Sequence, residues 1–139
     1  MDTFEQLNRI PRETNTTDFR IDSYNGENLL ITGSFDFCYY HEIEVDFKEV
    51  EYVNLPASFF NPKFSMANLA EQKIVRVQAG LDNAITIYKI EAETGLSEGS
   101  LSFYVAAMQV EIREGTVYYY ERDNLKEGER IAHWVKRSS

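Results

Sequence analysis

Three carboxylates at alternate positions are the residues of this sequence whose types and spacing could do chemistry. Glu42, Glu44 and Asp46 alternate with apolar residues inside the stretch FDFCYYHEIEVDFKEVEYVNLP, residues 35–56. Because alternate side chains of a strand project from the same face, the sequence predicts one row of carboxylates with neighbours roughly 6.5–7 Å apart. Such a row could hold Ca²⁺ or Mg²⁺, bind a basic partner protein or face water.

A metal site is the least supported of these interpretations. Ca²⁺ needs about six or more oxygens that converge from a loop, whereas a strand supplies a line of them. The two histidines, His41 and His133, lack the spacing of a zinc site. His41 is adjacent to Glu42, but neighbouring strand residues point to opposite faces. We therefore predict no metal and no cofactor, and structural roles for both histidines.

Nucleophilic catalysis has no motif in the chain either. The single cysteine, Cys38, lies next to aromatic residues, which predicts a small buried side chain. The sequence has no Gly-x-Ser-x-Gly elbow, no phosphate-binding Gly-x-x-x-x-Gly-Lys loop and no dinucleotide fingerprint. No residue is assigned a catalytic role, and these absences favour a protein that is not an enzyme.

Tyrosines form the second candidate site. Consecutive aromatic residues of a strand must face both sides of a sheet, so part of each run at 39–40 and 118–120 lies away from the inner core. These side chains could pack across strands or form a binding surface, for which tyrosine is well suited. The residues predicted for an aromatic surface or pocket are Tyr39, Tyr118, Tyr120 and Trp134.

Two long, kinked strands have to position these side chains. In residues 35–56 the apolar alternation slips by one near Lys48 and Glu49, which indicates a β-bulge. In residues 101–113 the same slip occurs near Ala106 and Ala107. Two bent strands of this length favour a curved sheet, and the sequence predicts a mainly β, β-rich α+β fold. The architecture would be an antiparallel sandwich or small curved barrel of about eight strands with a short N-terminal helix.

The remaining elements follow from local patterns. Residues 3–10, in the segment 1–12, predict a short helix that Pro11 stops or redirects. A hairpin with a three-residue loop at 24–26 would pair residue 21 with 29, and Gly33 would mark a bend or a close backbone approach. Residues 57–72 are expected to form a loop over the sheet, with one helical turn from Ser65. Further strands are predicted at 73–79, 84–93, 116–121 and 130–136.

Composition limits the classes of function. The 139 residues suit one domain, 1–139, with 14 basic and 23 acidic residues and a net charge of −9. This charge disfavours nucleic acid and anionic membranes, although the C-terminal segment 122–139 is slightly basic. With one cysteine, no secretory signal pattern and no long apolar run, we expect a cytoplasmic location.

These features predict a non-enzymatic protein-interaction module that binds a basic protein through the carboxylate row. Bacterial immunity and antitoxin proteins share this size and charge, and the likeness extends to those bulk properties alone. One alternative is a small-ligand-binding barrel or an enzyme with a tyrosine-lined pocket. Another is a structural subunit that forms homo-oligomers through a strand edge or the tyrosines.

Overall fold

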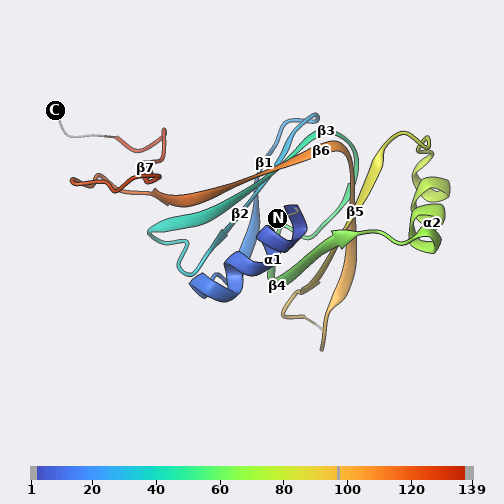
Figure 1. Ribbon diagram of the computed structural model, residues 1–139, viewed down its shortest axis with the longest axis horizontal. Coiled ribbons are helices and arrows are strands. Elements are labelled where there is room, and N and C mark those ends of the chain that lie inside the picture. The colour runs from blue at the N-terminus through green and yellow to red at the C-terminus, as the bar shows by residue number, and fades with distance from the viewer. Residues whose placement is uncertain (1–2, 97, 137–139) are drawn as a thin grey trace.

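A closed six-stranded antiparallel barrel forms the body of the molecule (Figure 1). The computed structural model describes residues 3–96 and 98–136; residues 1–2 and 137–139 of the expected terminal segments lie outside this description. Strand makes up 50% of the chain, and one further strand and two helices complete the fold. The predicted mainly β class with an N-terminal helix is confirmed, and the architecture is a barrel.

The barrel closes because its two longest strands pair with each other. Its strand order is β3-β2-β1-β4-β5-β6, and β6 pairs with β3. The strands are β1 (Asp18–Tyr24), β2 (Leu29–Ser34), β3 (Tyr40–Asn54), β4 (Ser58–Met66), β5 (Thr86–Glu93) and β6 (Leu101–Tyr118). A short parallel strand, β7 (Arg130–Ile131), extends the end of β6. The helices are α1 (Thr3–Thr14) and α2 (Leu69–Ala79), and Figure 1 shows α2 and β7 at opposite ends of the longest axis.

Large apolar side chains fill the barrel. Alternate residues of β3, Ile43, Val45 and Phe47, point inward and are almost fully buried. Leu7 and Ile10 of α1 pack into the same cluster. Because these side chains occupy the interior, it is a hydrophobic core, and binding sites have to be sought on the surface.

The two predicted phase slips lie opposite each other. Glu49 has a left-handed backbone, with φ of 53°, and the β3–β6 register shifts between Val50 and Tyr52. Their partners in β6 are Ala107 and Ala106, both completely buried. Ala107 belongs to the main core and Ala106 to a second cluster beneath α2. Both strands therefore bend at the point where the chain leaves one core for the other.

The β1–β2 hairpin has the predicted core residues on one face, but its turn and register differ from the prediction. The three-residue loop is wrong, because Tyr24 pairs with Leu29 across a four-residue turn. The Asn25 side chain accepts hydrogen bonds from two backbone N–H groups of this turn, at 2.9 and 2.7 Å. A register shift after Ile21 then pairs Ile21 with Ile31 and returns both to the core side.

Gly33 marks a close backbone approach, as predicted. A Cβ at this position would come within 2.5 Å of the Phe19 ring and 2.6 Å of Ile43. Glycine is needed here because strands β1 and β3 place bulky side chains on both sides of β2.

Two predictions of helix and strand type are wrong. Residues 57–72 contain β4 in place of the expected loop, and residues 73–79 belong to α2 in place of a strand. Asn68 and Glu71 form a reciprocal capping box at the start of α2, and left-handed Gly80 ends it. These caps select a helix for a segment whose β-branched residues, Ile74, Val75 and Val77, suggested a strand.

Three predicted boundaries are also wrong. Helix α1 continues through Pro11 to Thr14, because the burial of Leu7 and Ile10 against the barrel outweighs the proline. Strand β6 passes through residues 114–115 to Tyr118 instead of turning there. Gly115, with φ of 133°, lies where the β3–β6 register shifts a second time. Only Arg130–Ile131 of the expected strand 130–136 pairs as a strand.

Candidate functional site

Two hollows lie on the two sides of the ribbon that β3 and β6 form where they end near β7. The "tyrosine hollow", of about 430 Å³, is lined by Tyr39, Tyr40, Glu42, Thr116, Tyr118, Tyr120 and Arg122. The "C-terminal hollow", of about 420 Å³, is lined by Arg20, Asp22, Leu30, His41, Glu44, Arg113, Val117, Tyr119, Arg130, Ala132, His133 and Trp134. Tyr40 and Tyr118 belong to one hollow and His41 and Tyr119 to the other, because neighbouring strand residues face opposite sides.

A buried histidine connects three elements in the C-terminal hollow. His41 Nδ1 lies 2.6 Å from the Tyr119 hydroxyl, and Nε2 lies 2.8 Å from Oε2 of Glu44. The side chain is almost fully buried. Both ring nitrogens therefore have partners within the chain, and the imidazole links the Tyr119 hydroxyl to Glu44. Glu42, the sequence neighbour of His41, lines the other hollow, as expected for adjacent residues of a strand.

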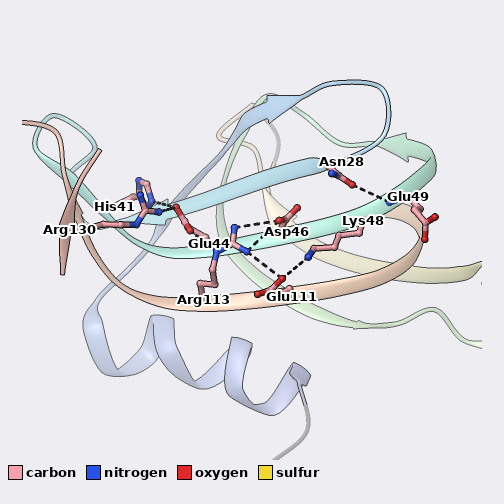
Figure 2. Close-up of polar contacts among 9 residues, drawn as sticks. All are labelled: Asn28, His41, Glu44, Asp46, Lys48, Glu49, Glu111, Arg113 and Arg130. Carbon is pink, nitrogen blue, oxygen red and sulfur yellow. Dashed lines mark hydrogen bonds and ion pairs between the residues drawn. The ribbon is translucent and has the colours of Figure 1, made fainter. Parts of the chain in front are cut away.

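Glu44 is the centre of the polar network (Figure 2). Arg113 Nε donates to Oε1 at 2.9 Å, and Arg130 Nη2 donates to Oε2 at 2.6 Å. The hydrogen bond from His41, with those of Arg113 and the charge of Arg130, outweighs burial and lowers the pKa of Glu44 to about 2. Glu44 is thus an ionised, buried carboxylate that links β3 to β6 and β7.

Asp46 of the carboxylate row and the neighbouring Glu111 of β6 are also bound by bases of the same chain. Arg113 also contacts Asp46 at 3.4 Å and Glu111 at 3.5 Å, and Lys48 contacts Glu111 at 2.8 Å. Figure 2 shows these side chains in a line along β3 and β6, with acids and bases interleaved. Glu44 and Asp46 therefore do not form the free acidic surface that the sequence predicted.

Glu42 lies apart from the other two carboxylates, so the prediction of a common face is wrong. Its Oε2 accepts a hydrogen bond of 2.9 Å from the Thr16 hydroxyl, and its side chain lines the tyrosine hollow. The physical reason is the register shift between His41 and Ile43 opposite Gly115, which changes the phase of the strand between Glu42 and Glu44.

Three of the four predicted aromatic residues meet in the tyrosine hollow. The Tyr120 ring lies 5.6 Å from that of Tyr118 and 6.4 Å from that of Tyr39. Arg122 places its guanidinium 4.4 Å from the centre of the Tyr118 ring and donates to the Tyr120 hydroxyl at 2.9 Å. Burial, reinforced by the hydrogen bond to Glu129, raises the pKa of Tyr118. The fourth residue, Trp134, lines the C-terminal hollow instead.

Sequence reasoning missed the arginines of the network. Arg113 and Arg130 lie 69 and 86 positions from Glu44, and no local pattern connects them. The tyrosine run contained a usable signal, because alternation places Tyr119 on the side opposite Tyr118 and Tyr120.

The prediction that Cys38 is buried is wrong. It is exposed, and its N–H bonds to the Asp36 side chain in the segment between β2 and β3.

The part of the chain that the structure describes offers neither a metal-ion cluster nor a membrane-spanning helix. Within residues 3–96 and 98–136, no three His, Cys, Asp or Glu side chains are placed to hold a metal ion. The helices in the same ranges are too short or too polar to cross a membrane.

Comparison with known proteins identifies no relative: no family model matches the chain, and no curated protein or solved structure matches it.

Proposed function

We propose that this protein is a non-enzymatic interaction module that binds a basic side chain of a partner protein in the tyrosine hollow. The observation that carries the proposal is the position of Arg122. Its guanidinium lies over the Tyr118 ring and bonds the Tyr120 hydroxyl, so the aromatic wall already holds one cation of its own chain. A wall with this geometry suits a second cation from outside.

The net charge of the molecule and the Glu42 carboxylate support a basic partner. The hollow is lined mainly by tyrosines, with one carboxylate, Glu42, and one guanidinium, that of Arg122, so the attraction of a second cation depends on Glu42 and the tyrosine rings. The net charge of −9 attracts a basic protein at long range, and it raises the rate of encounter at low salt. Tyr39 and Tyr120 are 57% and 39% exposed, so their rings are accessible to a partner. Exposed tyrosines with polar tips are frequent anchors of protein interfaces.

The lining of the tyrosine hollow supports binding in this hollow. The network of the other hollow is internally bonded: His41 contacts the Tyr119 hydroxyl and Glu44, and Glu44 also binds Arg113 and Arg130. Cys38 lines neither hollow. No histidine and no cysteine is among the residues that line the tyrosine hollow, where the partner is placed.

The test compares two substitutions in the hollow with matched controls elsewhere. Acetyl-arginine amide, with the uncharged citrulline analogue as reference, is titrated into isotope-labelled protein at low salt. For the arginine compound we expect NMR chemical-shift changes that are confined to residues of the tyrosine hollow. Glu42→Gln and Tyr39→Ala should each weaken the binding of this compound severalfold. The exposed residues Glu49 and Tyr24 give the controls Glu49→Gln and Tyr24→Ala, which should leave the titration unchanged.

A protein partner isolated by affinity capture should depend on the same residues. Its affinity should fall about tenfold with Tyr39→Ala, in line with an aromatic anchor at an interface, and should weaken as salt rises. Equal chemical-shift changes with the citrulline analogue would contradict the proposal. So would a partner whose affinity is unchanged by Glu42→Gln and Tyr39→Ala. Sedimentation across protein concentrations separates it from self-association.

A further inference from the structure

Arg20 carries a positive charge without a carboxylate partner. It lies on β1 in register with Thr32 of β2, which in turn pairs with Glu44 of β3. Its guanidinium lies 4.1 Å from the centre of the Phe37 ring and is partly buried. Within the described residues, no carboxylate approaches Arg20 to ion-pair distance, in a chain with 23 acidic residues. The other neighbour of Arg20 is Tyr119, whose side chain it hydrogen-bonds and whose ring centre lies 6.0 Å away. A partly buried cation that has aromatic neighbours and no carboxylate at ion-pair distance is a candidate contact for an anion.

The hollow that Arg20 lines is basic although the molecule is acidic. Three arginines and both histidines of the chain line the C-terminal hollow, against two carboxylates, Asp22 and Glu44. Arg130 bonds Glu44 through Nη2, and its side chain is 53% exposed, which leaves other guanidinium N–H groups facing solvent. In the same cross-strand row, the buried Thr32 hydroxyl has no hydrogen-bond partner among the described residues.

Trp134 supplies a flat surface beside these charges. It is 59% exposed, and its ring centre lies 5.2 Å from that of Tyr119. A volume of about 420 Å³ falls within the range of small-molecule sites, roughly 300–1,000 Å³. An exposed indole beside arginines favours a ligand that combines a planar ring with a negative charge.

We propose that the C-terminal hollow binds a small organic anion, with its phosphate or carboxylate group held by Arg20 and Arg130 and a planar ring against Trp134. This site lies on the side of the β3–β6 ribbon opposite the tyrosine hollow, so it is independent of the proposed protein partner. Arg113 is bound to Glu44 and Asp46, and it shapes the hollow without being free to bind.

Trp134 makes the test direct, because it is the only tryptophan of the chain. Its fluorescence is titrated with adenosine monophosphate, which has a ring and a phosphate, and with benzoate, which has a ring and a carboxylate. Neutral adenosine and inorganic phosphate are the references. We expect saturable quenching by at least one ring-bearing anion, with adenosine at least about tenfold weaker. The two anions distinguish a phosphate from a carboxylate ligand.

Arg20→Gln should weaken binding of the anion about tenfold, whereas Arg122→Gln in the other hollow should leave it unchanged. No saturable quenching by either anion, equal affinity for adenosine, or unchanged affinity in folded Arg20→Gln would overturn the proposal. Where Arg20→Gln does not fold, two other measurements test the proposal. Arg130→Gln should weaken binding of the anion, and the NMR chemical shift of the Trp134 indole N–H in the native protein should change when the anion is added but not when adenosine is added.

Discussion

Arg130 donates from Nη2 to Oε2 of Glu44 across 2.6 Å, and this bond joins two residues 86 positions apart. The same carboxylate oxygen lies 2.8 Å from His41 Nε2. The contact attaches the segment after β6 to the barrel, and both hollows depend on that segment. It provides Arg130 and Trp134 to the C-terminal hollow, and Arg122 to the tyrosine hollow. The polar network, together with the pairing of β7 with β6, thus attaches a segment that contributes residues to both proposed sites.

Glu44→Gln should destabilise the folded protein. This change leaves Arg130 and His41 beside a neutral group in a buried site, so we expect the free energy of unfolding to fall by about 3 kcal/mol. Urea denaturation at neutral pH measures the effect. The exposed Glu49 provides the control, and Glu49→Gln should change stability by less than about 0.5 kcal/mol. Equal stability of the two variants would show that the network is not stabilising.

Stability should also depend on pH on the acid side. The pKa values of Glu44 and Glu71 are lowered to about 2 from an ordinary 4.5, chiefly by hydrogen bonds from His41 and from Lys89 respectively. Because the folded state binds these protons less readily, the stabilisation is complete above about pH 4.5 and is lost as the pH falls toward 2. Urea unfolding at a series of pH values should show this decline, with a shallower slope in Glu44→Gln. A flat profile between pH 4.5 and 2 would contradict the assignment.

Gly33→Ala should destabilise the barrel. The added methyl would come 2.5 Å from the Phe19 ring and 2.6 Å from Ile43, so one of these buried side chains has to move. We expect a loss of about 1–3 kcal/mol in thermal or urea unfolding. The double variant with Phe19→Leu tests the cause, because a smaller side chain relieves the contact. Its loss should be less than the sum of the two single losses, and simple additivity would count against the steric explanation.

Helix α2 should loosen when Glu71 is changed. Glu71 accepts from Lys89 at 2.7 Å, from the Tyr104 hydroxyl at 2.7 Å and from the Asn68 N–H at 3.0 Å. Glu71→Gln weakens both the capping box and the contact with the barrel, at a cost of about 1 kcal/mol. Amide hydrogen exchange should accelerate severalfold in α2 alone. Lys73→Gln, at an exposed position of the same helix, should have no effect, and protection unchanged in α2 of Glu71→Gln would refute the role.

Much of the fold could be predicted because its signals are local. The alternation of Ile43, Val45 and Phe47 identifies β3, and the phase slips near Glu49 and Ala106 mark the bends. The segment that became α2 was predicted to be a strand although it too carries local helix signals, Asn68 followed by Glu71 and Gly80 at its end. Its β-branched residues fit a strand, and the deciding features were the caps at Asn68 and Gly80, together with the burial of Val75.

The sequence by itself determined the β class, the bent strands and the acidity of the chain, because each depends on residue type or short spacing. Only the tertiary structure decided what the carboxylates do. The register shift opposite Gly115 sends Glu42 to the tyrosine hollow and leaves Glu44 among His41, Arg113 and Arg130. A change of one residue in register moves a side chain to the other face of a sheet, and the bases that neutralise Glu44 come from distant strands.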